Sequence, residues 1–115
     1  MSLPTDPAQL QETAPVFAAL GDSTRLALLA RLQDGRAHAI VDLTEGSGLS
    51  RQAISKHLNV LQAAGLVRQQ RVGRERRYLF HPKGIERART YLETASAQWD
   101  AAITRLKLFA EQDID

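Results

Sequence analysis

The last third of the chain repeats an apolar residue every three or four positions, and this regularity limits the fold more than any other feature. The positions are Ile85, Ala88, Leu92, Ala95, Trp99, Ala102, Leu106 and Phe109. Alternating steps of three and four place them all on one side of an α-helix, over about three heptads. The spacing therefore predicts one long helix over residues 83–111. Sustained heptads are typical of helices that pair with a second helix.

Four shorter helices are expected before this segment. Asp22 and Ser50 are N-cap residues that stand directly before apolar stretches. Gly35 and Gly65 follow these stretches, where a left-handed residue can end a helix. Pro15 lies inside the first helical pattern and is expected either to kink that helix or to mark its true start. The four helices are assigned to residues 8–20, 23–34, 39–46 and 50–63.

Between residues 66 and 81 the apolar period changes from that of a helix to that of a strand. Val67, Val72, Tyr78 and Phe80 are strand-forming residues set among arginines, and Gly73 lies between the two runs. A β-hairpin with a basic tip is therefore expected over 66–81. A chain of 115 residues has the size of one compact domain, so we expect a single domain over 1–115, mainly α with one β-hairpin.

The charge of the chain is concentrated in its middle. The formal net charge of +2 hides two acidic ends, because residues 1–50 and 90–115 each carry −3, whereas residues 51–89 carry +8. A basic segment between acidic ones is typical of a surface that faces a polyanion.

Several classes of function find no support in the sequence. The chain has no cysteine, which excludes disulfides, thiolate metal sites and thiol redox chemistry. No stretch approaches the roughly 18 apolar residues that cross a bilayer, and the start lacks the basic and then apolar layout of a secretion signal. A cytoplasmic protein without membrane contact is expected. There is no glycine-rich phosphate loop and no suggestive set of nucleophile, base and acid, so an enzyme is not expected.

A short helix, a glycine-containing turn, a capped helix and a basic hairpin follow one another in the order of a winged helix-turn-helix. The capped helix would enter the major groove of double-stranded DNA with its first turns toward the base edges. Arg51 can pair with guanine and Gln52 with adenine, whereas Ser50 and Lys56 suit phosphate oxygens. The DNA-contacting residues expected on this helix are Ser50, Arg51, Gln52, Ser55, Lys56 and His57.

The hairpin offers long cations on a narrow ribbon, which can reach backbone phosphates or enter a narrow minor groove. The DNA-contacting residues expected there are Arg71, Arg74, Arg76 and Arg77.

Each of these patterns also has a plainer interpretation. A polar helix face is equally expected of a helix that only meets solvent. The hairpin arginines could serve solubility and pair with Glu75 across the strands. One acid cannot neutralise five neighbouring bases, and the order of the elements around the helix favours DNA contact.

Three stretches of the chain resemble the ArsR/SmtB family of bacterial repressors, and the likeness spans residues from about 14 to 110 in order. The stretches are Ala19-Leu20-Gly21-Asp22-Ser23-Thr24-Arg25, Leu49-Ser50-Arg51-Gln52-Ala53-Ile54-Ser55-Lys56-His57-Leu58-Asn59-Val60-Leu61 and Ala64-Gly65-Leu66-Val67.

This resemblance implies a repressor that forms a homodimer through its first and last helices. Two recognition helices would then be presented to an inverted-repeat operator near a promoter. The interface residues expected on this basis are Leu10, Phe17, Leu92, Ala95, Trp99, Ala102, Leu106 and Phe109.

The sequence departs from the metal sensors of that family. Ala39 and Val41 stand where those members carry cysteines around the third helix. Other members bind zinc through histidines of the last helix, and no histidine follows His81 here. No metal and no cofactor is therefore expected. The chain is similar instead to a metal-independent branch with Trp99-Asp100 in the last helix, whose members often repress their own operon.

Two other functions stay open at this point. A winged helix can serve as a protein-interaction module, although such an interface would carry less charge than residues 51–89 do. A sensor would hold a metal or a small molecule in a cavity at the dimer interface. The expected partners are double-stranded DNA and a second copy of the chain, and the sequence names no inducer.

Overall fold

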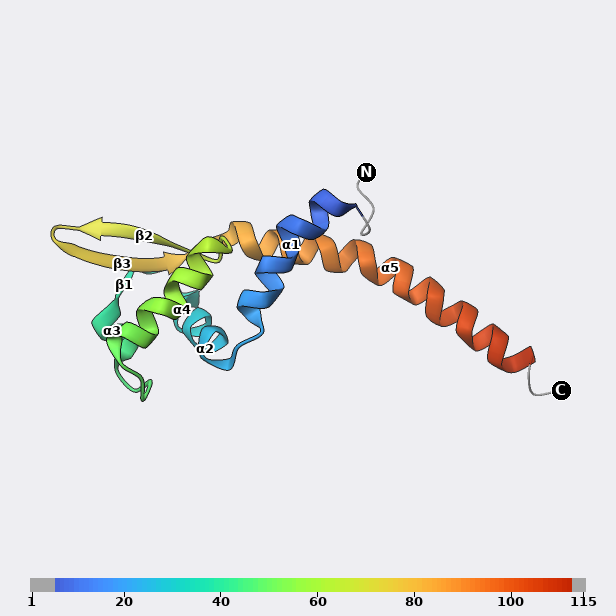
Figure 1. Cartoon of the computed structure of the whole chain (residues 1–115), viewed down its shortest axis with the longest axis horizontal. Helices are drawn as coiled ribbons and strands as arrows, with labels where there is room; N and C mark the ends of the chain where they lie inside the picture. Colours follow the sequence, from blue (N-terminus) through green and yellow to red (C-terminus); the bar gives the residue numbers. More distant parts are fainter. Residues whose placement is uncertain (1–5, 113–115) are drawn as a thin grey trace.

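The computed structural model describes residues 6–112. These residues form five α-helices, one 3₁₀-helix and three strands in the order α1, α2, η1, β1, α3, α4, β2, β3 and α5 (Figure 1). Residues 1–5, which hold most of the start considered for a secretion signal, and residues 113–115 of the expected domain lie outside this range. The molecule measures 70 × 32 × 22 Å, because the far half of α5 projects beyond the other elements.

Helix α1 spans Pro7–Leu20 and runs through a proline. Asp6 caps its start by accepting a hydrogen bond from Ala8 N at 3.0 Å. Pro7 occupies a first-turn position whose N–H would have no partner in the helix. The helix continues past Pro15, so the alternative that Pro15 marks its true start is wrong. Val16, in the turn that follows the proline, is buried in the core and holds this turn in place.

The next two helices are shorter than expected. Helix α2 spans Ser23–Arg31 and tightens into the 3₁₀-helix η1, Leu32–Asp34, before Gly35 ends it with a left-handed φ of 76°. The helix expected over 23–34 is therefore α-helical only to Arg31. Helix α3 spans Ile40–Thr44 rather than 39–46, because Ala39 belongs to a strand and Gly46 turns the chain with a φ of 74°.

The strands form one antiparallel sheet in the order β1-β3-β2. Strands β2, Val67–Val72, and β3, Glu75–Phe80, make the hairpin, which we call the wing. Strand β1, His38–Ala39, pairs with the other side of β3 and was not expected from the sequence. Two residues are too few to show the period of a strand. The pairing ties the segment before α3 to the base of the wing.

The core lies where α1, α2, α3 and α4 meet the base of the wing. Helix α4 spans Arg51–Ala63, and its inner stripe of Ile54, Leu58 and Leu61 is fully buried. This stripe fixes the rotation of α4 about its own axis, so that its polar side turns outward. Other large, fully buried side chains are Leu32, Leu43, Leu66 and Tyr78.

The end of α4 lies against the start of α5, Pro82–Gln112. Gly65 has a left-handed φ of 74°, and its carbonyl accepts a hydrogen bond from Gly84 N at 2.9 Å. A Cβ on Gly84 would lie 2.7 Å from the carbonyl oxygen of Ala64. Only a residue without a side chain permits this approach of two main chains.

We expect Gly84→Ala to lower the free energy of unfolding by about 1 to 3 kcal/mol, the usual cost of overpacking where the neighbour is main chain. Urea unfolding at one fixed protein concentration measures the change. Gly21→Ala is the matched control, because its φ is −81° and the added Cβ would meet no atom closer than 3.4 Å. Equal stability of Gly84→Ala and the wild type would contradict the contact.

Candidate nucleic-acid interface

Helix α4 begins with a capped and exposed first turn. Ser50 adopts an extended conformation, with φ −76° and ψ 161°, and its Oγ accepts a hydrogen bond from Ala53 N at 3.1 Å. The hydroxyl hydrogen of Ser50 stays available to an outside acceptor, because the cap uses only the oxygen. Arg51 and Gln52 follow directly and are exposed. The free N–H groups and the positive dipole end of this turn favour an anion such as phosphate.

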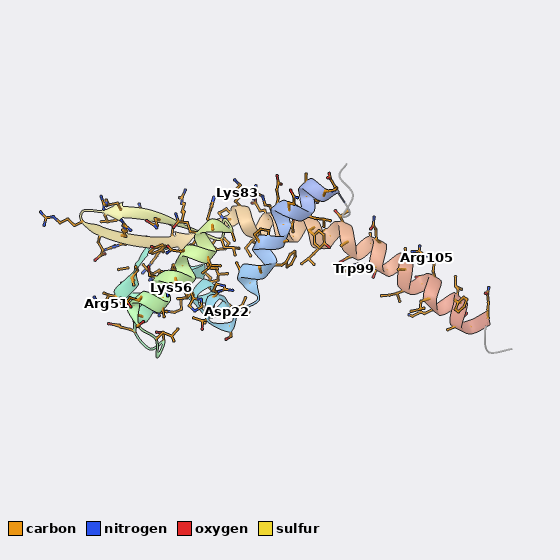
Figure 2. The ribbon with its side chains drawn as sticks, in the orientation of Figure 1. Asp22, Arg51, Lys56, Lys83, Trp99 and Arg105 are labelled. Atoms are coloured by element: carbon orange, nitrogen blue, oxygen red, sulfur yellow. The ribbon has the colours of Figure 1, made fainter. Side chains whose placement is uncertain are left out.

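The polar side chains of α4 share the surface outside its buried stripe. Arg51, Gln52 and Lys56 are exposed, and Ser55 is half-buried beside them. Figure 2 shows Arg51 at the end of α4 that lies next to α3, and Lys56 further along the same helix. The structure thus brings together four of the six residues predicted on this helix, and Ser50 caps its start.

The wing places two cations opposite each other near its tip. Gly73, with a left-handed φ of 64°, and Arg74 form a two-residue turn between the strands. Arg71 on β2 is directly opposite Arg76 on β3, so their side chains lie on the same face of the hairpin. Like charges in this position repel each other, and an anion between them would relieve the repulsion.

Arg77 differs from the other predicted wing residues. Its Nε donates to Glu75 Oε1 at 2.6 Å, on the face of the hairpin that is opposite to Arg76. Both residues belong to β3, so this ion pair lies along one strand, whereas the plainer interpretation of the wing placed the pairing with Glu75 across the strands. Within residues 6–112, the wing cations without an ion-paired carboxylate are Arg68, Arg71, Arg74 and Arg76, of which all but Arg68 are predicted DNA contacts.

A groove lies between the wing and α4, the recognition helix of the expected helix-turn-helix. Arg76 borders it on the side of the wing, and Arg51 and Gln52 border it on the side of α4. Ile40 and Val41, at the start of α3, lie between them. Three of the residues predicted on α4, Arg51, Gln52 and Ser55, therefore share one groove with Arg76 of the wing.

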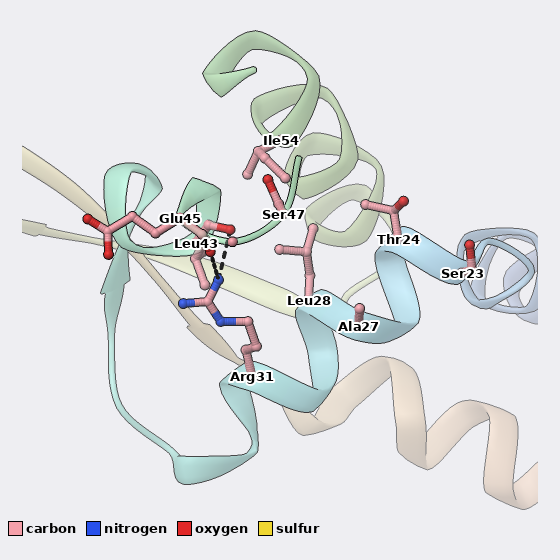
Figure 3. Close-up of a pocket in the computed structure, with 10 residues that line it drawn as sticks. Ser23, Thr24, Ala27, Leu28, Arg31, Leu43, Glu45, Ser47 and Ile54 are labelled. Atoms are coloured by element: carbon pink, nitrogen blue, oxygen red, sulfur yellow. Dashed lines mark hydrogen bonds between the residues drawn. The ribbon is translucent and has the colours of Figure 1, made fainter. Parts of the chain in front are cut away.

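Arg31 holds the short helix α3 in place and was not found from the sequence. Its guanidinium donates to the carbonyls of Asp42, Leu43 and Glu45 at 2.7, 2.9 and 3.3 Å. Figure 3 shows this side chain, which extends from α2 across a pocket next to the turn between α3 and α4. The bonds satisfy carbonyls at the end of α3 that have no partner within so short a helix. No local sequence pattern predicts these hydrogen bonds, because Arg31 and the carbonyls that it binds lie more than ten residues apart in the sequence.

His57 is the one predicted residue of α4 that turns away from this surface. Its Nδ1 lies 3.3 Å from a guanidinium nitrogen of Arg25 and 3.7 Å from Asp22 Oδ2. The ring therefore faces α2. The structure does not bring His57 together with Arg51, Gln52 and Lys56.

Comparison with known proteins agrees with this geometry. A family described as a helix-turn-helix domain matches residues 20–70. The HTH-type transcriptional regulator Rv2034 of Mycobacterium tuberculosis is 38% identical over 88 residues, which cover 76% of this chain and 78% of the relative. An ArsR-like transcriptional regulator from Rhodococcus sp. RHA1 has a TM-score of 0.81 and 39% identity over 94% of this chain and 98% of that chain. The chain belongs to the ArsR family.

Membership of the ArsR family makes the chain a transcriptional regulator with a helix-turn-helix DNA-binding domain, and not an enzyme. The expected winged helix-turn-helix fold is confirmed. Mb0332 of Mycobacterium bovis, described as a homodimeric winged helix-turn-helix DNA-binding domain, has a TM-score of 0.61 and 29% identity over 83% of this chain and 82% of that chain.

The residues predicted to join two copies of the ArsR-family chain differ in how far they are exposed. Leu106 and Phe109 are 68% and 63% exposed on the outer half of α5, and Trp99 is 51% exposed (Figure 2). Ala95 is only 1% exposed, because its own protomer already covers it. Leu10, Leu92 and Ala102 are exposed, Phe17 is half-buried, and the sequence pattern missed two further exposed apolar residues, Ile103 and Leu108.

Within one copy of the chain, the histidines of the described segment do not gather with acidic residues into a set of metal ligands. In residues 6–112 no three side chains of histidine, aspartate or glutamate gather as metal ligands would. His38 instead pairs with Asp34 at 2.8 Å, away from α4. Over the same part of the chain, no helix combines the length and the apolar character that a bilayer span needs.

Asp22 is held in its charged form by the start of α2. Its Oδ2 accepts a hydrogen bond from Arg25 N at 3.0 Å, and this bond, with the charge of the Arg25 guanidinium, lowers the pKa of Asp22 below its ordinary value of 3.8. Asp34 is similar, because a hydrogen bond from Arg36 N at 2.8 Å and the ring of His38 lower its pKa.

We expect Asp22→Asn to remove part of the acid sensitivity of the fold. A carboxylate whose pKa is lower in the folded state stabilises the fold above its unfolded pKa, and this stabilisation is lost as the pH falls through the folded pKa. Asparagine keeps the cap acceptor. Between about pH 5 and pH 3, Asp22→Asn should therefore lose less unfolding free energy than the wild type.

Urea unfolding at a series of pH values in that range measures the difference. Asp100→Asn, on the exposed outer half of α5, is the control. The same loss of stability in Asp22→Asn and the wild type would show that the cap carboxylate does not contribute.

Proposed function

We propose that this ArsR-family regulator is a repressor that binds an inverted-repeat operator as a homodimer, in the cytoplasm, the compartment in which such a regulator meets DNA. One observation carries the proposal. The chain displays a basic surface on α4 and the wing, and an uncovered helix with an apolar stripe at the opposite end (Figure 2).

This surface would make two kinds of DNA contact, one to base edges and one to phosphates. Arg51 and Gln52 lie in the first turn of α4 and select bases in the major groove, because a guanidinium matches guanine and an amide matches adenine. Ser55, one turn further, adds to this selection. Lys56 and the Ser50 hydroxyl bind phosphate and fix the register of the helix on the duplex.

Arg71, Arg74 and Arg76 supply affinity that does not depend on sequence. The repulsion between Arg71 and Arg76 falls when a phosphate or a narrow minor groove lies between them. Arg77 contributes less to DNA binding than these three, because its guanidinium is already bound by Glu75.

The size and shape of the chain support a second copy on α5. Its accessible surface is 8056 Å², whereas a compact protein of this mass exposes about 6,200 Å². Its radius of gyration is 19.1 Å, against about 13 Å for a compact domain of this length. The exposed apolar residues that a partner would cover are Leu10, Leu92, Trp99, Ile103, Leu106 and Phe109.

A two-fold axis through paired α5 helices would turn two recognition helices toward one face of a duplex. Such a dimer reads two half-sites related by the same two-fold symmetry, which makes the operator an inverted repeat. Occupation of a site that overlaps a promoter blocks transcription. Ala39 and Val41 offer no ligand atom near α3, in agreement with a regulator that works without a metal.

We expect Arg74→Ala combined with Arg76→Ala to weaken binding to all DNA sequences and to flatten its dependence on salt. Each lost phosphate contact lowers the slope of log K against log salt by about 0.9, so a dimer that loses four contacts should lose about 3 to 4 units. Fluorescence anisotropy at several salt concentrations measures the slope.

Arg105→Ala combined with Lys107→Ala is the charge-matched control, since both cations lie on the outer half of α5. An unchanged slope in the wing variant would exclude the wing from the contact.

We expect Leu106→Glu combined with Phe109→Glu to give a monomer, because two carboxylates cannot be buried in the apolar interface without a large desolvation cost. Ala101→Glu combined with Thr104→Glu places the same charges on the opposite side of α5 and is the control. Sedimentation or light scattering reports the mass of each protein.

The wild type should protect two half-sites on a duplex selected from genomic fragments and should reduce transcription from a promoter that carries them. The monomeric variant should lose this protection. A dimeric Leu106→Glu, Phe109→Glu protein, or a single protected half-site with the wild type, would contradict the proposal.

A further inference from the structure

The recognition helix is attached to α1 by side-chain contacts that the DNA-reading surface does not use. Arg25, in the first turn of α2, donates from Nε to Ala19 O at 2.6 Å and from Nη2 to Ala18 O at 3.2 Å. These carbonyls belong to the last turn of α1, where the helix no longer supplies i+4 donors. Ala18 O also accepts a hydrogen bond from Gly21 N at 3.3 Å. Nη1 of the same guanidinium lies 3.3 Å from Nδ1 of His57, in the middle of α4. One side chain thus joins the end of α1 to the centre of the recognition helix.

We propose that Arg25 and His57 are positioning residues that fix the angle between α1 and the recognition helix, and that their link holds only while His57 is neutral. The inference rests on the proposed function, in which α1 belongs to the dimer interface and α4 to the DNA surface. The two recognition helices of a dimer must fit two half-sites at once. The angle between α1 and α4 therefore decides how well the second helix fits when the first is bound.

The hydrogen bond between Arg25 and His57 depends on the protonation state of the His57 ring. A guanidinium only donates hydrogen bonds, so Nδ1 of His57 must be the acceptor from Arg25, with the ring proton on Nε2. Protonation places a hydrogen on Nδ1, which ends the bond and leaves two cations facing each other. Asp22 Oδ2, 3.7 Å from Nδ1, then becomes an acceptor within reach. The protonated ring would exchange its contact with Arg25 for one with Asp22.

The charged groups that face His57 come from the start of α2, namely the carboxylate of Asp22 and the guanidinium of Arg25. Helix α1 contributes only main-chain carbonyls to this cluster. In the described part of the chain, α3, β2 and β3 place no side chain in hydrogen-bond or ion-pair contact with the ring. The side chain of His57 is 23% exposed, so water can deliver the proton.

A positioning role predicts a pH dependence opposite to that of a direct contact with DNA. A protonated histidine that touched phosphate would strengthen binding as the pH falls. A histidine that must stay neutral to hold α4 weakens binding over the same range, in which histidine ordinarily gains its proton.

The experiment compares the wild type with His57→Asn and His57→Leu on the selected operator duplex. Anisotropy titrations at about pH 7.5 and about pH 5.5, at one ionic strength, span the range in which histidine titrates. Asparagine supplies an acceptor in place of Nδ1 and does not titrate, whereas leucine supplies none. His38→Asn is the matched control, because it removes an imidazole ring that is bonded to Asp34 outside α4.

At the higher pH, His57→Asn should bind as the wild type does. His57→Leu should bind about tenfold more weakly, the effect of one lost hydrogen bond to a charged group. Between the two pH values the wild type should lose about fivefold to tenfold more affinity than His57→Asn, and His38→Asn should follow the wild type. Thermal unfolding and the mass of each variant show that fold and dimer are kept.

Two results would overturn the inference. One is a wild-type affinity that rises more steeply at low pH than that of His57→Asn, which would make His57 a direct DNA contact. The other is a His57→Leu protein that binds as tightly as the wild type. Failure of the wild type itself to bind DNA at the higher pH would instead overturn the proposed function.

Discussion

Where α4 ends, its main chain passes so close to the first turn of α5 that a single methyl group on Gly84 would meet the carbonyl of Ala64. The left-handed turn at Gly65 and the hydrogen bond from Gly84 N fix this crossing. The geometry of the molecule depends on it, because α4 carries the polar surface and α5 carries the long apolar stripe. The orientation of one helix is thereby transmitted to the other through main-chain atoms, which adjust less readily than side chains do.

The other supports of α4 are built from arginines that bind carbonyl groups at helix ends. Arg31 completes the end of α3, and Arg25 completes the end of α1 while it contacts the ring of His57. Both arginines lie on α2, so this helix connects the elements on either side of it without touching DNA in the proposed complex. Neither guanidinium forms an ion pair with a carboxylate in the described residues. Helix α2 therefore acts through hydrogen bonds to main-chain oxygens rather than through charge pairing.

Much of this fold could be predicted from local patterns, because helix caps and apolar periods depend on residues that are close together in the sequence. Asp22 and Ser50 mark the starts of α2 and α4, and the spacing from Ile85 onward predicts α5 within one residue at either end. What could not be predicted depends on contacts between distant segments. Strand β1 exists only because β3 pairs with it, and His57 faces α2 only because Arg25 and Asp22 approach it there. The heptad pattern treats Ala95 and Trp99 alike, although the fold covers the first and leaves the second exposed.

The position of β2 has a consequence for the protein when no DNA is bound. It is an edge strand of the sheet, and such strands present free N–H and carbonyl groups on which another chain can add a strand. Its exposed side chains include Arg68 and Arg71. Long cations on an edge strand make edge-to-edge pairing with the same strand of a second copy unfavourable. Arg71, which would bind DNA in the proposed complex, and its neighbour Arg68 therefore also oppose the growth of extended sheets from free copies of the protein.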